Sequence, residues 1–74
     1  MDAKIFDKIK KAIKIGSLNL DKHANGDWFN WHSHTLLIEP LFMAMGRQIG
    51  YSISIKGQKG EIQCDFDLKK IEIA

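Results

Sequence analysis

An apolar stripe near the start of the chain is the feature that most constrains the fold. Over residues 2–15, apolar side chains recur at steps of three and four, and lysines fill most of the remaining arc. This spacing predicts an amphipathic helix, because residues three and four apart share one helical face. The stripe consists of Ile5, Phe6, Ile9, Ala12 and Ile13.

The expected ends of this helix have suitable residues. Asp2 is the expected N-cap, and Gly16 suits the left-handed position that follows a last helical turn. Lysines near the carboxyl end of the helix interact favourably with the helix dipole. The helix at residues 2–15 is therefore the clearest prediction that the sequence makes.

The next segment, residues 17–31, changes character. Leu18 and Leu20 alternate with polar residues, which is the pattern of a strand. Asn25-Gly26 is a strong turn signal, because both residues tolerate a positive φ. The aromatic run that starts at Trp28 favours a returning strand. The sequence thus predicts a hairpin with Asn25-Gly26 near its tip.

Residues 33–50 allow two interpretations. One helix could run from Ser33 or Thr35 to Gly50, or residues 35–38 could be extended with a helix starting at Pro40. The second is preferred, since proline favours the first helical position and the residue before it prefers extended geometry. We therefore expect a largely buried helix over residues 40–49.

A second hairpin is predicted over residues 51–67. Two runs, 51–56 and 62–67, alternate apolar and polar residues, and Gly57-Gln58-Lys59-Gly60 forms the turn between them. Ile71 and Ile73 continue the alternation. The expected fold class is α+β: an N-terminal amphipathic helix, a hairpin, a second buried helix and a C-terminal hairpin, with both helices on one face of an antiparallel sheet.

Length and composition point to one small domain covering residues 1–74. A single cysteine, Cys64, excludes an intrachain disulfide. Because so short a chain buries little surface, we expect a homodimer. The sequence contains neither a signal peptide nor an apolar run long enough to span a bilayer, so the expected location is the cytoplasm without membrane contact.

Three aromatic residues within four positions are the strongest indication of a partner. On a strand, Phe29 and Trp31 share one face while Trp28 points to the other. A domain this small can bury only one of these faces, and tryptophan is enriched at protein interfaces. The sequence therefore predicts a small non-catalytic binding module, of the regulator, inhibitor or immunity type, that contacts a protein through Trp28, Phe29 and Trp31.

Histidines suggest other chemistry. His32 and His34 would share a face on a strand, and His23 with Cys64 could complete a zinc site. These histidines and the single cysteine lack the paired Cys or Cys/His spacings of known zinc sites, so we expect neither a metal nor another cofactor.

The alternative function is nucleic-acid binding or metal-independent ribonuclease activity. Phosphate contacts would come from one side of the first helix, and His32 or His34 with a carboxylate such as Asp27 would supply acid–base groups. The net charge of +2 is too small to favour this interpretation, and enzyme activity is not expected although the sequence does not decide it. The candidate phosphate contacts are Lys4, Lys8, Lys11 and Lys14.

Overall fold

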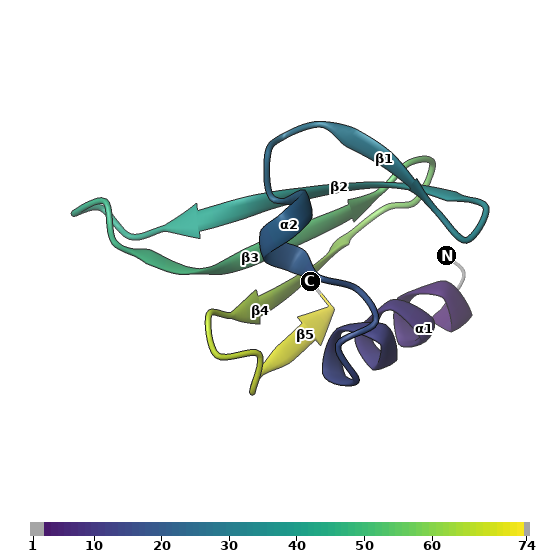
Figure 1. Ribbon diagram of the computed structural model, residues 1–74, viewed down its shortest axis with the longest axis horizontal. Helices are drawn as coiled ribbons and strands as arrows, with labels where there is room; N and C mark the ends of the chain where they lie inside the picture. The colour runs from purple at the N-terminus through teal and green to yellow at the C-terminus, as the bar shows by residue number, and fades with distance from the viewer. Residues whose placement is uncertain (1–2, 74) are drawn as a thin grey trace.

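The computed structural model describes residues 3–73 and contains one main helix, one helical turn and a five-stranded sheet (Figure 1). The helical elements are α1 (Ala3–Lys14) and α2 (Leu20–His23). The strands are β1 (Trp28–Trp31), β2 (His34–Phe42), β3 (Gln48–Ile55), β4 (Glu61–Asp65) and β5 (Ile71–Ile73). The fold class is therefore α+β, as the sequence predicts.

The sheet is an antiparallel meander in which spatial order follows chain order, β1-β2-β3-β4-β5. Each strand pairs with the strand before it through a short connection, so no crossover is needed. The short strands β1 and β5 form the two edges. The hairpin at residues 51–67 is confirmed as β3 and β4, and the alternation through Ile71 and Ile73 as β5.

Helix α1 lies against one face of the sheet, called here the inner face. Its apolar stripe packs with strand residues such as Leu36, Ile38 and Ile53 in a single core cluster. Because successive strand residues point to opposite faces, Leu37 and Glu39 lie on the other, outer face. The helical prediction for residues 2–15 is confirmed to within a residue at each described end, while Asp2 lies outside the described residues.

The second helical element lies where the sequence predicts a strand. Residues 20–23 form one turn, capped by the Asn19 side chain, which accepts from the Lys22 backbone N–H at 3.2 Å. The side chain of Asn25 accepts from the Asp27 N–H at 3.0 Å, which makes a local turn before β1. The predicted hairpin over 17–31 is wrong: Asn25-Gly26 links a helical turn to a strand, and β1 pairs with β2 instead.

The helix expected over residues 40–49 is also wrong. Pro40 lies inside β2, opposite Tyr51, and the chain reverses over Ala44-Met45-Gly46. The Met43 N–H donates to the Arg47 carbonyl at 2.8 Å, and Gly46 has a φ of +83°. A left-handed residue at the end of a three-residue loop closes a hairpin, so Gly46 serves a turn. The extended geometry expected for residues 35–38 is confirmed.

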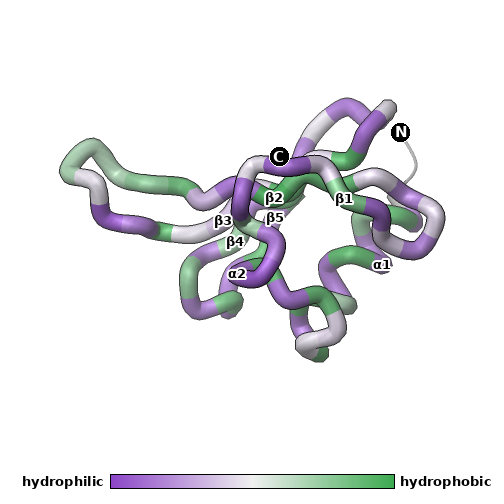
Figure 2. The backbone as a smooth tube through the Cα atoms, turned by 45° about the horizontal axis from the view of Figure 1, so that its top comes forward, coloured by the Kyte–Doolittle hydropathy of each residue, from purple (hydrophilic) through white to green (hydrophobic). Residues whose placement is uncertain are grey.

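The far end of this hairpin, residues 41–49, forms a projection that we call the finger. Figure 1 shows it extending along the longest axis of the molecule, away from α1. That axis measures 35 Å, against 24 and 22 Å for the others. Figure 2 shows hydrophobic colour along the β2 side of the finger up to its tip. The finger thus carries apolar residues beyond the part of the sheet that α1 covers.

Charge is divided unevenly between the two faces. Five lysines lie on α1, whereas Glu39 and Glu72 share one row across the outer face with Ser52 and Gln63. Neighbouring Glu61 accepts a hydrogen bond from the buried Ser52 hydroxyl.

Neither described helix has the length and apolar character needed to cross a bilayer.

Gly50 is required by close packing rather than by a turn. A Cβ built on Gly50 would lie 1.9 Å from the Cys64 carbonyl oxygen, next to the irregular pairing at Leu41/Phe42. Gly50→Ala should therefore lower the free energy of unfolding by roughly 1–3 kcal/mol, as measured by urea denaturation. Ser54→Ala, on the same strand, is the matched control and should change it little. Equal stability of Gly50→Ala and the wild type would contradict this account of the β3–β4 contact.

Candidate functional site

The β1–β2 hairpin holds the three aromatic residues that the sequence singles out. Trp28 pairs with Leu37 and therefore lies on the outer face, while Phe29 and Trp31 lie on the inner face and pack partly buried against the core. Trp28 remains 50% exposed. The predicted division of the aromatics between two faces matches the structure, and only Trp28 presents a large open apolar surface.

Neighbouring side chains hold this hairpin in place. The His23 ring of α2 stacks on Phe29, with centroids 4.1 Å apart and planes within 8°. On the outer face, Leu37 of β2 is the residue that pairs with Trp28, so the two side chains are cross-strand neighbours. β1 is also an edge strand, so one side of its backbone has no strand neighbour. Trp28 is consequently an exposed indole on a supported strand.

The turn of this hairpin is strained. Trp31 pairs with His34, which leaves His32 and Ser33 as the connection, and their φ values are +45° and +68°. Two positive φ angles characterise a type I′ turn, which normally uses Asn and Gly. The expectation that His32 and His34 share a strand face is wrong, because His32 belongs to the turn and only His34 lies on β2.

The lysines of α1 meet the hairpin at its turn. All four candidate lysines are exposed, and the Lys8 Nζ lies 5.8 Å from the centroid of the Trp31 ring. The His32 ring meets Trp31 edge-on at 4.5 Å. Lys8, Lys11, Trp31 and His32 line one hollow of about 180 Å³. This hollow combines cationic and aromatic side chains, the two contributions that single-stranded nucleic acid uses.

The candidate metal ligands are not brought together. Within residues 3–73 no three His, Cys, Asp or Glu side chains gather in a way that could hold a metal ion. Cys64 is buried, and its thiol contacts the Tyr51 carbonyl at 3.9 Å. Burial raises the pKa of the Cys64 thiol, which disfavours the nucleophilic thiolate. Cys64 therefore packs as a small apolar residue.

A second hollow, of about 260 Å³, lies between the end of α1, α2 and Tyr51. The Tyr51 hydroxyl donates to Asp21 at 3.5 Å, and its ring stacks against Phe66 with centroids 6.0 Å apart. Burial and the nearby Asp21 carboxylate raise the pKa of Tyr51. A tyrosine with a raised pKa stays protonated at neutral pH, so it stabilises packing here and does not supply a base.

A second group of exposed apolar side chains lies on the finger and is not predicted by the sequence analysis. Phe42, Met43, Met45 and Ile49 are all exposed on the finger, and Phe66 is exposed close to its base. Met45 is 92% exposed. Residues 41–45 are apolar on every side, a pattern that favours a buried helix. Gly46, which follows them, is the signal that indicates a hairpin instead.

Comparison with known proteins gives no relative from which to transfer a role. No protein-family model matches the chain, and no significant match occurs among curated proteins or solved structures.

The strained turn yields a prediction with a definite sign. Glycine adopts left-handed φ values without the steric cost that serine carries, so Ser33→Gly should raise the free energy of unfolding by about 1 kcal/mol. Ser54→Gly, within β3, is the matched control and should lower it by roughly 0.5–1 kcal/mol. Both are measured by urea denaturation. A lower urea midpoint for Ser33→Gly would show that Ser33 makes a stabilising interaction that outweighs its strain.

Proposed function

We propose that this protein is a small non-catalytic binding module, a regulator, inhibitor or immunity-type protein, that contacts another protein through the β1–β2 hairpin. The observation that carries the proposal is Trp28, which is half exposed on the outer face of an edge strand. Trp28 pairs with Leu37 on this face, and tryptophan is among the residues most enriched at protein interfaces.

The surroundings of Trp28 support a specific contact. Leu37 extends the apolar area, while Asn30 and Thr35 form the next pair on the outer face and hydrogen bond to each other at 3.2 Å. An aromatic anchor bordered by polar groups is the arrangement that protein interfaces use most. Phe29 and Trp31 support the contact from beneath, because their packing against the core fixes the strand that carries Trp28.

The chemistry of the described residues favours binding over catalysis. The histidines are separated in role: His23 stacks on Phe29 and His32 lies in the turn against Trp31. General acid–base catalysis needs two groups aimed at one reacting atom. Among the described residues, no hydrogen bond joins His32 or His34 to a carboxylate, whereas Trp28 is already placed on an exposed face.

Partner binding should depend on Trp28. Tagged wild-type protein should capture one stoichiometric protein from a lysate of the native host, as identified by mass spectrometry, and Trp28→Ser should lose it. Loss of a central tryptophan costs at least about 2 kcal/mol of binding, or roughly thirtyfold in affinity. Ile15→Ser removes an apolar residue that is 68% exposed on another surface and should retain the partner. Equal capture by wild type and Trp28→Ser would reject the hairpin as the contact.

Nucleic-acid binding is the second candidate, and the hollow lined by Lys8, Lys11, Trp31 and His32 favours it. It would use stacking on Trp31 and phosphate contacts from the lysines.

The salt dependence of RNA binding tests this candidate. Each phosphate contact should contribute a slope of about −0.7 to a plot of log affinity against log salt for a single strand. The double variant Lys8→Gln/Lys11→Gln should therefore make the slope less steep by about 1.4, measured by fluorescence anisotropy with a labelled oligonucleotide. Lys59→Gln, in the β3–β4 turn, is the control. Absence of binding at low ionic strength would eliminate this function.

A further inference from the structure

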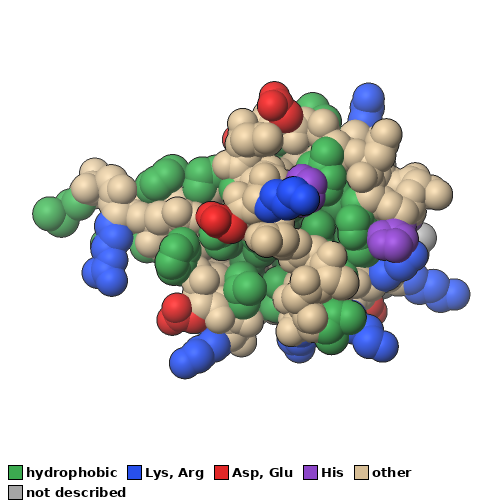
Figure 3. All heavy atoms as spheres, in the orientation of Figure 1, with side chains coloured by type: hydrophobic (Ala, Val, Ile, Leu, Met, Phe, Trp, Pro, Cys, Tyr) green, Lys and Arg blue, Asp and Glu red, His purple; other side chains and the backbone are tan. Residues whose placement is uncertain are grey.

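The finger and the neighbouring β4–β5 turn line one hollow together, and the surface that they form is called here the finger surface. It lies at the end of the molecule that α1 leaves uncovered (Figure 3). Its exposed apolar side chains are Phe42, Met43, Met45, Ile49 and Phe66. Monomeric proteins rarely expose this many large apolar residues together, so the finger surface needs an occupant.

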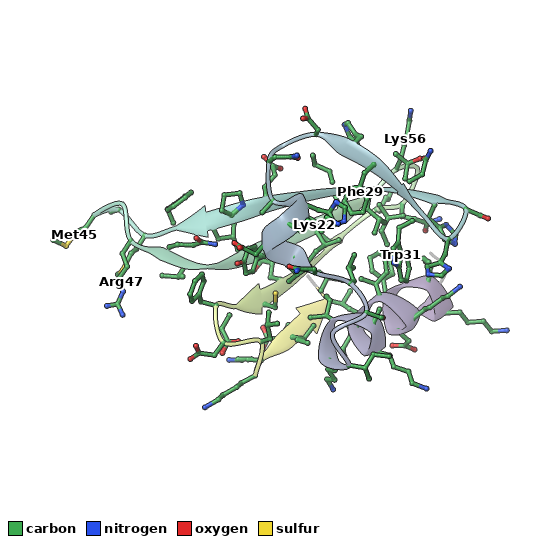
Figure 4. All side chains as sticks on the ribbon, viewed as in Figure 1. Lys22, Phe29, Trp31, Met45, Arg47 and Lys56 are labelled. Atoms are coloured by element: carbon green, nitrogen blue, oxygen red, sulfur yellow. The ribbon has the colours of Figure 1, made fainter. Side chains whose placement is uncertain are left out.

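This surface carries both a projection and a hollow. Met45 stands at the tip of the finger, and Figure 4 shows it at the extreme end of the molecule. A hollow of about 420 Å³ lies beside the base, and its lining mixes apolar with charged or polar side chains: Met43, Arg47, Gln48, Ile49, Asp65, Phe66 and Asp67. A flexible methionine side chain is well suited to packing against the apolar part of this lining, which Met43, Ile49 and Phe66 form.

The finger surface also carries both signs of charge. Arg47 extends from the finger away from the rest of the molecule, and within residues 3–73 it forms no ion pair (Figure 4). Asp67 is exposed and lines the same hollow as Arg47. Residues 41–49 contain no carboxylate, so the cation lies toward the tip and the anion at the base.

The geometry points to a second copy of this chain as the occupant. Two fingers related by a two-fold axis lie antiparallel, so Met45 of each copy enters the hollow of the other and Arg47 meets Asp67 of the partner copy. A two-fold interface requires one patch to complement itself, and the finger surface carries both members of each contact. β1 lies at the other end of the molecule and stays open, so this inference goes beyond the proposed partner contact (Figure 1).

Sedimentation equilibrium across micromolar to millimolar concentrations tests the dimer. The wild type should form a concentration-dependent dimer, and Met45→Asp should raise its dissociation constant more than about tenfold, because the introduced carboxylate would lose water beside Asp65 and Asp67 of the partner copy. Met45 is exposed in the single chain, so the variant should keep its circular dichroism spectrum. Ile15→Asp and Trp28→Ser are controls outside the finger surface and should dimerise as the wild type does.

A charge exchange tests the proposed register. Arg47→Asp and Asp67→Arg should each be monomeric alone, because each places like charges in both symmetry-related contacts. An equimolar mixture of the two variants should form a heterodimer, since both contacts then join opposite charges. A monomeric wild type throughout the concentration range, a dimer insensitive to Met45→Asp, or a mixture that stays monomeric would each overturn the proposal.

Discussion

One constraint governs the arrangement of this molecule: a single helix of 12 residues has to cover a sheet that is much longer than the helix. At 1.5 Å per residue α1 spans about 18 Å, whereas the molecule extends 35 Å. The side chains beneath α1, such as Leu36, Ile38 and Ile53, are completely buried. Beyond the helix the same two strands become exposed, and Phe42 on β2 is 57% exposed. The exposed finger follows directly from the limited reach of α1.

The sequence predicts those elements whose periodicity has a single interpretation. The stripe of α1 and the alternation of β3 and β4 each fit one period, and each is observed. Residues 41–45 fit neither period, because an all-apolar run is compatible with a buried helix or a strand. Their conformation is decided by distant partners: Leu41 pairs with Gly50 and Phe42 with Gln48, so the start of the run continues β2 alongside β3. The local conformational preference of Pro40 contains no information about which distant strand will pair with β2.

The candidate site shows the same division between local and distant information. Strand alternation alone separates Trp28 from Phe29 and Trp31, so the exposed indole could be anticipated. The exposed methionines could not, since their exposure depends on where α1 ends relative to the sheet. Strand alternation predicts that His32 and His34 share one face, but a two-residue turn with positive φ values at His32 and Ser33 breaks that alternation. Asn and Gly are the usual residues of such a turn, so His32 and Ser33 give no sequence signal for it.

The two exposed apolar surfaces differ physically in a way that fits different partners. Trp28 stands on a strand held by Leu37, Phe29 and the stacked His23 ring, so little conformational entropy remains to be lost when it is covered. Such a preformed anchor suits discrimination between partners. The finger tip has no packing beneath it, and the side chain of Met45 keeps its rotamers until it is buried. That ordering cost makes the finger a weak contact on its own. In the proposed two-fold dimer each contact and its ordering cost occur twice, whereas the translational and rotational freedom lost on association is lost once.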